Sequence, residues 1–181
     1  QSSLRYSEKL SKKINSKIYV KYENENTTGS FKERGALNKL LSLSDLEKKQ
    51  GVIAASAGNH AQGVAYHAGK LNIPAVIVMP KSTPITKVET TKSFGADVIL
   101  AGDTFDECLQ TMEAIQNERH LICIHPFDNE HIIAGQGTIG LEIDRQIDTL
   151  DSILIPIGGG GMIAGMTIAL KETRPNLKIY G

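Results

Sequence analysis

The sequence has no tryptophan, only two cysteines among 181 residues, and no excess of charge of either sign. Cys108 and Cys123 are too far apart in sequence for a C-x-x-C redox or zinc pair, and a chain of this length does not need a disulfide to fold. We therefore expect reduced thiols and a cytoplasmic protein. Twenty Lys and Arg balance twenty Asp and Glu, so no long-range field would attract nucleic acid or an anionic membrane.

Long hydrophobic runs are also missing. No apolar stretch approaches the roughly 20 residues that span a bilayer, and residues 1–13 are polar and charged rather than signal-like. The sequence therefore predicts neither secretion nor a membrane anchor. It begins with Gln1 rather than Met and stops at Gly181, directly after the β-prone Lys178–Tyr180, so we expect part of a longer protein.

The residues that are present predict an α/β fold. Short runs rich in Val and Ile alternate with longer segments of helical period, which is typical of parallel sheets wrapped by helices. The predicted strands are Ile18–Tyr22, Val52–Ala55, Ala75–Met79, Val98–Leu100, Leu121–Ile124, Ile153–Ile157 and Lys178–Tyr180. The predicted helices are Phe31–Leu43, His60–Leu71, Ile85–Phe94, Phe105–Asn117, Gly137–Ile147 and Met162–Thr173. Ser44 with Glu47 fits a capping box, and Asp103 or Thr104 would cap the helix at Phe105.

The order of the strands suggests two lobes. The four strands between Val52 and Ile124 form a compact set, so we expect a small lobe over residues 51–128. Residues 1–50 and 129–181 would build part of a larger lobe.

The first candidate for chemistry is Lys32. It stands in the first turn of a predicted helix that follows a Gly-Ser turn, where the positive end of the helix dipole disfavours an ammonium ion and favours a nucleophilic amine. Most lysines in such positions are nevertheless solvated surface charges, so the segment does not by itself establish a function.

A glycine loop, Gly158–Gly161, gives the strongest signal. An apolar strand runs into four consecutive glycines and then into a helix that begins near Met162. Backbone N–H groups without side chains can approach a phosphate closely, and the helix start adds its positive dipole. A tight strand-to-helix turn is the alternative, but such a turn needs one or two glycines rather than four.

A third loop joins a strand to a helix through Ser56, Ala57, Gly58, Asn59 and His60. Backbone donors at a helix start can bind a carboxylate, and the Asn59 amide could donate a hydrogen bond to a phenolate-like oxygen. Capping of the helix by Ser56 or Asn59 explains the loop equally well, and His60 could be a base or a structural histidine.

A nucleophilic lysine, a phosphate-binding loop and a carboxylate-binding loop are together the requirements of Schiff-base chemistry on an amino acid. The segments Ser30–Ala36, Ser56–Gly63 and Gly158–Gly161, in this order, resemble the serine/threonine dehydratase group of fold-type II pyridoxal-phosphate enzymes. His125–Asp128 and Ala134–Glu142 resemble it as well, and the arrangement is particularly similar to the shorter, catabolic threonine dehydratases.

The resemblance implies a role for each motif. Lys32 would bind pyridoxal 5′-phosphate covalently and act as the base at Cα, Phe31 would flank the pyridine ring, and Asn59 would bond the ring's 3′-oxygen. Gly158, Gly159, Gly160 and Gly161 with Met162 would hold the phosphate, and Ser56 to His60 would take the substrate carboxylate. The reaction would be β-elimination of threonine or serine to a 2-oxo acid and ammonia in a homo-oligomer, without a metal site in this part of the chain.

Two residues depart from the family pattern. Glu33 follows the lysine where similar sequences carry an apolar residue or Asp, and we expect its carboxylate to face solvent. Ala57 replaces a serine that protonates the opposite face in serine racemases, which argues against racemisation. The alternatives are a β-replacement, threonine synthase-like or serine racemase-like activity, and a non-catalytic phosphate-binding fragment.

Overall fold

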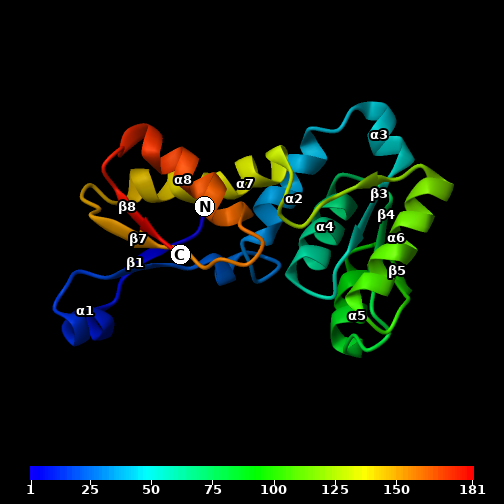
Figure 1. Ribbon diagram of the computed structural model, residues 1–181, viewed down its shortest axis with the longest axis horizontal. Helices are drawn as coiled ribbons and strands as arrows, with labels where there is room; N and C mark the ends of the chain where they lie inside the picture. Colours follow the sequence, from blue (N-terminus) through cyan, green and yellow to red (C-terminus); the bar gives the residue numbers. More distant parts are fainter.

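The computed structural model describes residues 1–181 as three small sheets surrounded by helices (Figure 1). None of the helices is sufficiently long and apolar to pass through a membrane. In chain order the elements are β1 (Leu4–Tyr6), α1 (Glu8–Ile14), β2 (Tyr19–Lys21), the 3-10 turn η1 (Glu23–Glu25), α2 (Lys32–Leu41), α3 (Asp45–Gln50), β3 (Val52–Ala55), α4 (Asn59–Lys70), β4 (Ala75–Met79), α5 (Ile85–Ser93), β5 (Asp97–Leu100), α6 (Phe105–Arg119), β6 (Ile122–Cys123), α7 (Glu130–Gln146), β7 (Ser152–Leu154), α8 (Gly161–Thr173) and β8 (Lys178–Tyr180).

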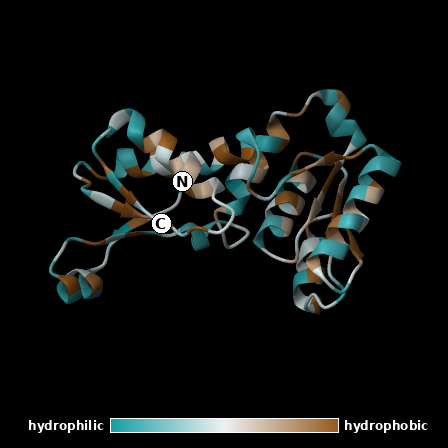
Figure 2. Ribbon diagram, viewed as in Figure 1, coloured by the Kyte–Doolittle hydropathy of each residue, from teal (hydrophilic) through white to brown (hydrophobic).

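A parallel sheet of four strands, in the order β5-β4-β3-β6, forms the centre of one half of the chain. Successive residues of its strands point to opposite faces of the sheet, and a separate core lies on each face. Ala54 and Ile77 pack with residues of α2, α4 and α5 on one face, whereas Ile53 and Val78 pack with Cys108 and Met112 of α6 on the other. Because both faces are covered, β3 and β4 are apolar and buried throughout, and they lie as hydrophobic ribbons between the helices in Figure 2.

The other half of the chain is built on α7 and α8, which pack against each other and against the parallel pair β7-β8. Ile139, Ile143, Met166 and Leu170 form this core. Strands β1 and β2 pair antiparallel, and Figure 1 shows α1 at the far end of the arm that they form. Helix α2 contacts both α4 and α7, so it joins the two halves.

The crossing of α2 and α7 depends on two glycines. A Cβ built on Gly135 would lie 2.6 Å from the Cα of Gly35, and one built on Gly35 would lie 2.4 Å from the amide nitrogen of Gln136. Any larger residue at either position would push the two backbones apart. The helix that begins with Lys32 therefore has a fixed place against α7.

The predicted α/β class with parallel sheets is confirmed, and three strands have the predicted bounds, namely β3, β4 and β8. The capping box of Ser44 with Glu47 is present, and Thr104 rather than Asp103 caps α6. The expected strand Ile153–Ile157 ends at Leu154, which leaves residues 155–160 as a loop. The four-stranded sheet lies within residues 51–128, whose boundaries as a separate lobe stay a prediction.

Three elements were not predicted from the sequence, namely β1, α1 and η1. The bounds of α7 were also wrong, because it begins at Glu130 rather than Gly137. Asn129 caps it by accepting hydrogen bonds from the backbone N–H groups of His131 and Ile132. The glycines at 135 and 137 are helical because they sit at close helix contacts, where tertiary packing outweighs their low propensity.

Candidate active site

A cavity of about 420 Å³ lies between the start of α2, the start of α8 and the turn at residues 125–128. It brings together most of the predicted lysine and cofactor residues, namely Phe31, Lys32, all four residues of the glycine loop and Met162. Its remaining lining residues are Lys21, Glu23, Pro126, Phe127, Gln136, Pro156 and Ile157. Its volume falls in the range of about 300–1,000 Å³ that is usual for small-molecule sites.

Lys32 lies in the first turn of α2, as predicted, and is its first residue, and its side chain is half-buried. Burial lowers the pKa of its amine, since the charged form loses hydration. Its Nζ donates a hydrogen bond to the carbonyl oxygen of Pro126 at 2.6 Å and lies 5.4 Å from the ring centroid of Phe31. The structure thus holds the amine at the cavity wall in an environment that favours a nucleophile.

Glu33 does not face solvent as expected. Its carboxylate accepts hydrogen bonds from the backbone N–H and the hydroxyl group of Thr28, both at 2.8 Å, and the residue is half-buried. These hydrogen bonds hold the Glu33 carboxylate against the preceding loop. The pKa of Lys32 is consequently lowered by burial, with no opposing contribution from Glu33.

The glycine loop has two kinds of position. A Cβ on Gly159 or Gly161 would collide with Phe127, with closest distances of 2.2 Å and 2.6 Å. Gly158 and Gly160 have open space where a Cβ would lie, and Gly160 caps α8 with a φ of 84°, which favours glycine. Phe127 therefore supports the loop from one side, while the open positions and the first N–H groups of α8 can receive an anion.

Gln136 of α7 lines the same cavity and was missed as a site residue. It is 1% exposed, and its amide oxygen has no hydrogen-bond partner. Buried polar atoms without a partner are rare in proteins and often mark the place of a ligand or water. The segment Ala134–Glu142 had been noticed in the sequence, but the role of this amide depends on the contact between α7 and α2.

The predicted carboxylate-binding residues are not among those that line the cavity. Asn59 is exposed at the start of α4, and Ser56, Ala57 and Gly58 are partly exposed. The loop is nevertheless near Lys32, because a Cβ on Gly63 in the second turn of α4 would lie 3.2 Å from the Lys32 carbonyl carbon.

His60 is buried, and its Nε2 lies 2.8 Å from the carbonyl oxygen of Ile124. Burial is the main cause that lowers its pKa to about 4, and the nearby Lys32 charge adds to this effect. At neutral pH the ring is uncharged, so Nε2–H donates to the carbonyl and ties α4 to the end of β6. This position is that of a structural histidine, one of the two possibilities left open by the sequence.

A network of buried charges fixes α2, and two of its members, Lys21 and Glu23, also line the cavity. Arg34 bonds to Glu23 at 2.7 Å and to Glu142 at 2.6 Å, and Lys21 bonds to Glu142 at 2.6 Å. Burial would lower the pKa of Arg34, but the hydrogen bonds to Glu142 and Glu23 raise it. Burial would likewise raise the pKa of Glu142, but the bonds from Arg34 and Lys21 outweigh it and lower this pKa to about 2. Arg34 and Glu142 are therefore both charged at neutral pH.

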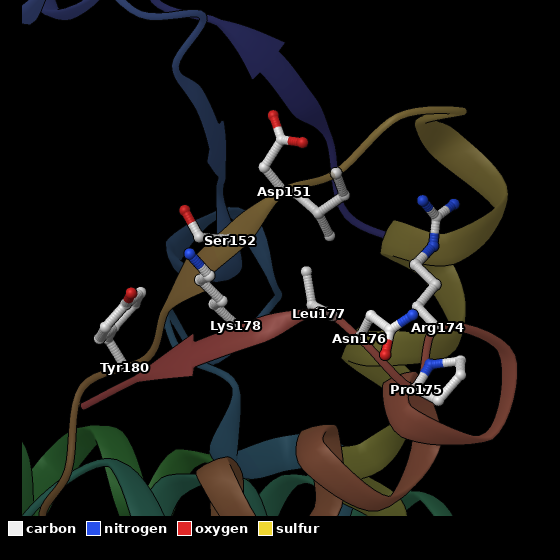
Figure 3. A pocket seen from close by; sticks show the side chains of 9 residues that line it. Asp151, Ser152, Arg174, Pro175, Asn176, Leu177, Lys178 and Tyr180 are labelled. Atoms are coloured by element: carbon white, nitrogen blue, oxygen red, sulfur yellow. The ribbon is translucent and has the colours of Figure 1, made fainter.

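A larger cavity, of about 590 Å³, lies around β7, β8 and the turn after α8 (Figure 3). Its one guanidinium belongs to Arg174, which bonds to the Asp144 carboxylate and to carbonyl oxygens at the end of α7. It contains none of the predicted site residues. No group of three or more His, Cys, Asp or Glu side chains is placed to hold a metal ion.

The whole chain, residues 1–181, matches the family model described as "Pyridoxal-phosphate dependent enzyme". It is 48% identical over 181 residues to the L-threonine ammonia-lyase of Thermotoga maritima, and this alignment covers all of this chain and 45% of that protein. It is 46% identical over 172 residues to the catabolic L-threonine dehydratase TdcB of Escherichia coli, covering 95% of this chain and 52% of the relative. The chain thus spans about half the length of these relatives.

Two solved structures also have a similar fold. The processed form of threonine deaminase isoform 2 from Solanum lycopersicum superposes with a TM-score of 0.96 at 46% identity, over 98% of this chain and 49% of that one. Maize serine racemase gives a TM-score of 0.95 at 35% identity, over 98% and 54%. From the full-length family match and these similarities, the chain belongs to the family of pyridoxal-phosphate dependent enzymes.

Proposed function

We propose that this chain provides the lysine and the phosphate-binding loop of a pyridoxal-phosphate dependent dehydratase. The enzyme would remove the β-hydroxyl and amino groups of threonine or serine, giving 2-oxobutanoate or pyruvate and ammonia. The observation that carries the proposal is that one cavity joins a half-buried amine of lowered pKa, Lys32, to the glycine loop at the start of α8.

The residues of the cavity fit the cofactor. The open space at Gly158 and Gly160 and the N–H groups at the start of α8 suit a phosphate, and Met162 borders the same position. Phe31 offers an apolar surface for the ring beside Lys32. The buried amide of Gln136, with no partner for its oxygen, is the kind of polar group that a ligand or an ordered water would satisfy.

When bound, pyridoxal phosphate supplies an aldehyde that reacts with an amine and a conjugated ring that stabilises negative charge at Cα. The chain supplies the rest of the chemistry through Lys32. Because burial favours its neutral form, Nζ can act as the nucleophile and, when free, can take the Cα proton as a general base. The Pro126 carbonyl orients the free amine through their hydrogen bond.

The loop from Ser56 to His60 is the proposed binding site for the substrate carboxylate. Its backbone N–H groups precede or begin α4, whose positive dipole suits an anion, and the exposed Asn59 amide is available for the 3′-oxygen of the cofactor. Ala57 lacks a group that could deliver a proton to the opposite face, so elimination is favoured over racemisation. The relatives named threonine ammonia-lyase and threonine dehydratase support the same choice.

The decisive experiment adds threonine and serine separately to the protein loaded with pyridoxal phosphate and measures 2-oxo acid. Lys32→Ala is the matched variant. Product in the wild type and none in the variant supports the proposal, whereas equal product in both refutes it. Formation of another amino acid in the presence of a nucleophile would indicate β-replacement.

A second measurement does not need turnover. Borohydride reduction followed by peptide mass spectrometry should locate the cofactor on Lys32. Tight cofactor binding without a reducible adduct would instead indicate a non-catalytic phosphate-binding protein. The predicted cytoplasmic location and homo-oligomeric state belong to the proposal, and size-exclusion chromatography with light scattering tests the oligomer.

A further inference from the structure

One tight turn contacts both reactive parts of the cavity. It consists of His125, Pro126, Phe127 and Asp128, and we call it the His125 turn. The Pro126 carbonyl oxygen accepts the hydrogen bond from Lys32 at 2.6 Å. Phe127 lies directly against the glycine loop, since its ring and carbonyl oxygen occupy the space where a Cβ of Gly159 or Gly161 would be. The position of this turn therefore determines where the Lys32 amine and the glycine loop lie.

The imidazole of His125 holds the turn together. Its Nδ1 lies 2.7 Å from the backbone nitrogen of Asp128 and 3.3 Å from that of Phe127, and it accepts hydrogen bonds from both N–H groups. Its ring also packs edge-on against the ring of Phe127, with 4.7 Å between the ring centroids. No other side chain takes these two backbone donors, so the turn depends on a single acceptor atom.

An acceptor role requires that Nδ1 carries no proton. A protonated Nδ1 would face two N–H groups and would have to turn away, which would release the backbone on either side of Pro126. The titratable groups around the ring are Lys32 of α2, His60 of α4 and Asp128 of the turn itself. His60 bonds to the carbonyl of Ile124, so three consecutive residues, 124 to 126, are each held by a defined polar contact.

We propose that His125, with Nδ1 unprotonated, is a positioning residue that places the Pro126 carbonyl and the Phe127 ring and thereby aligns the Lys32 amine with the glycine loop. The inference rests on the proposed function in one respect, namely that Lys32 reacts with pyridoxal phosphate. It predicts that removal of the acceptor atom at position 125 misplaces the amine although Lys32 itself is unchanged.

Two substitutions test the acceptor atom. In His125→Asn the amide oxygen, one bond beyond Cγ like Nδ1, can accept the same two N–H groups in an Asx turn. His125→Leu keeps the bulk and removes the acceptor. The control is His120→Asn, because His120 is exposed and has a φ of 53°, which asparagine tolerates.

The assay measures the rate at which added pyridoxal phosphate forms its reducible adduct with Lys32. Cofactor absorbance is followed after pyridoxal phosphate is mixed with the cofactor-free protein. His125→Leu should slow this rate about tenfold at pH near 8, the scale of losing backbone hydrogen bonds, while His125→Asn should stay within about twofold.

Wild-type rates in His125→Leu would overturn the inference. Should His125→Leu fail to fold, nitrogen NMR of ¹⁵N-histidine-labelled wild type still decides. This spectrum should show His125 with a proton on Nε2 and none on Nδ1 at neutral pH, and the opposite tautomer contradicts the proposal. If Lys32→Ala forms the same adduct as wild type, the proposed function itself has failed.

Discussion

A methyl group added at Gly158 would enter open space, because no atom lies within 4 Å of its ideal Cβ and its φ lies outside the left-handed region. Gly158→Ala should therefore fold normally. At a backbone position that alanine can adopt, this exchange changes the free energy of unfolding by less than about 1 kcal/mol, usually in the stabilising direction. Gly158 lines the cavity that contains Lys32.

If the cofactor phosphate occupies that space, the same methyl group must displace it. Loss of a backbone hydrogen bond to a charged oxygen costs about 1.5–3 kcal/mol, so the Kd for pyridoxal phosphate should rise roughly 10- to 150-fold. Pyridoxal, which lacks the phosphate, should bind wild type and Gly158→Ala equally. Both affinities can be measured by titrating cofactor absorbance, together with urea unfolding of each protein.

Gly159→Ala is the matched variant. Its Cβ would lie 2.2 Å from ring atoms of Phe127, so we expect lower stability and weaker binding of both ligands. A stable Gly158→Ala protein that binds pyridoxal phosphate as tightly as wild type would refute the assignment of this loop to the phosphate.

Three further substitutions test the surrounding fold. Glu142→Gln should lower the free energy of unfolding in urea by about 3–5 kcal/mol at neutral pH, because Lys21 would keep a buried charge without its carboxylate partner and Arg34 would lose one of its two. His60 has a folded pKa of about 4, below the unfolded value near 6.5, so its contribution to stability is present above about pH 6.5 and is lost as pH falls towards 4. That loss is on the order of 3 kcal/mol, and His60→Gln should remove this slope from stability measured against pH. Ser44→Ala should lower the stability by about 1 kcal/mol in thermal unfolding, because it removes one half of the capping box of α3.

Each of these has a clear contrary result. The control for Glu142→Gln is Glu172→Gln, an exposed glutamate on α8, and equal losses in the two variants would contradict a buried charge network. An unchanged slope in His60→Gln would show that another group controls acid unfolding. A Tm for Ser44→Ala equal to that of wild type would mean that α3 does not need its cap.

The parallel sheet could be predicted because its signal is local. β3 and β4 are continuous apolar runs, which is the composition expected of strands that are buried on both faces. Lys32 and the glycine loop were found for a similar reason, since each stands where a helix begins and the residue types are unusual there.

The parts that were missed depend on contacts between distant residues. The bond between Arg34 and Glu142 joins positions 108 residues apart, and nothing local in either segment indicates it. The amide of Gln136 is a site candidate because it lines the cavity where α7 crosses α2 at Gly35, a contact that neither segment indicates alone. β1 is short and lacks a clear period, so its pairing with β2 decides its structure.

The close crossing at Gly35 and Gly135 affects how a mutational scan of this protein should be interpreted. Neither glycine lines the cavity, yet a single added carbon at either one would force apart the backbones that support the reactive lysine. Such variants would score as inactive while every group that takes part in the reaction remained in the sequence. A scan that records only turnover would classify these two spacer positions as essential chemistry, and a parallel measurement of folded protein would distinguish them.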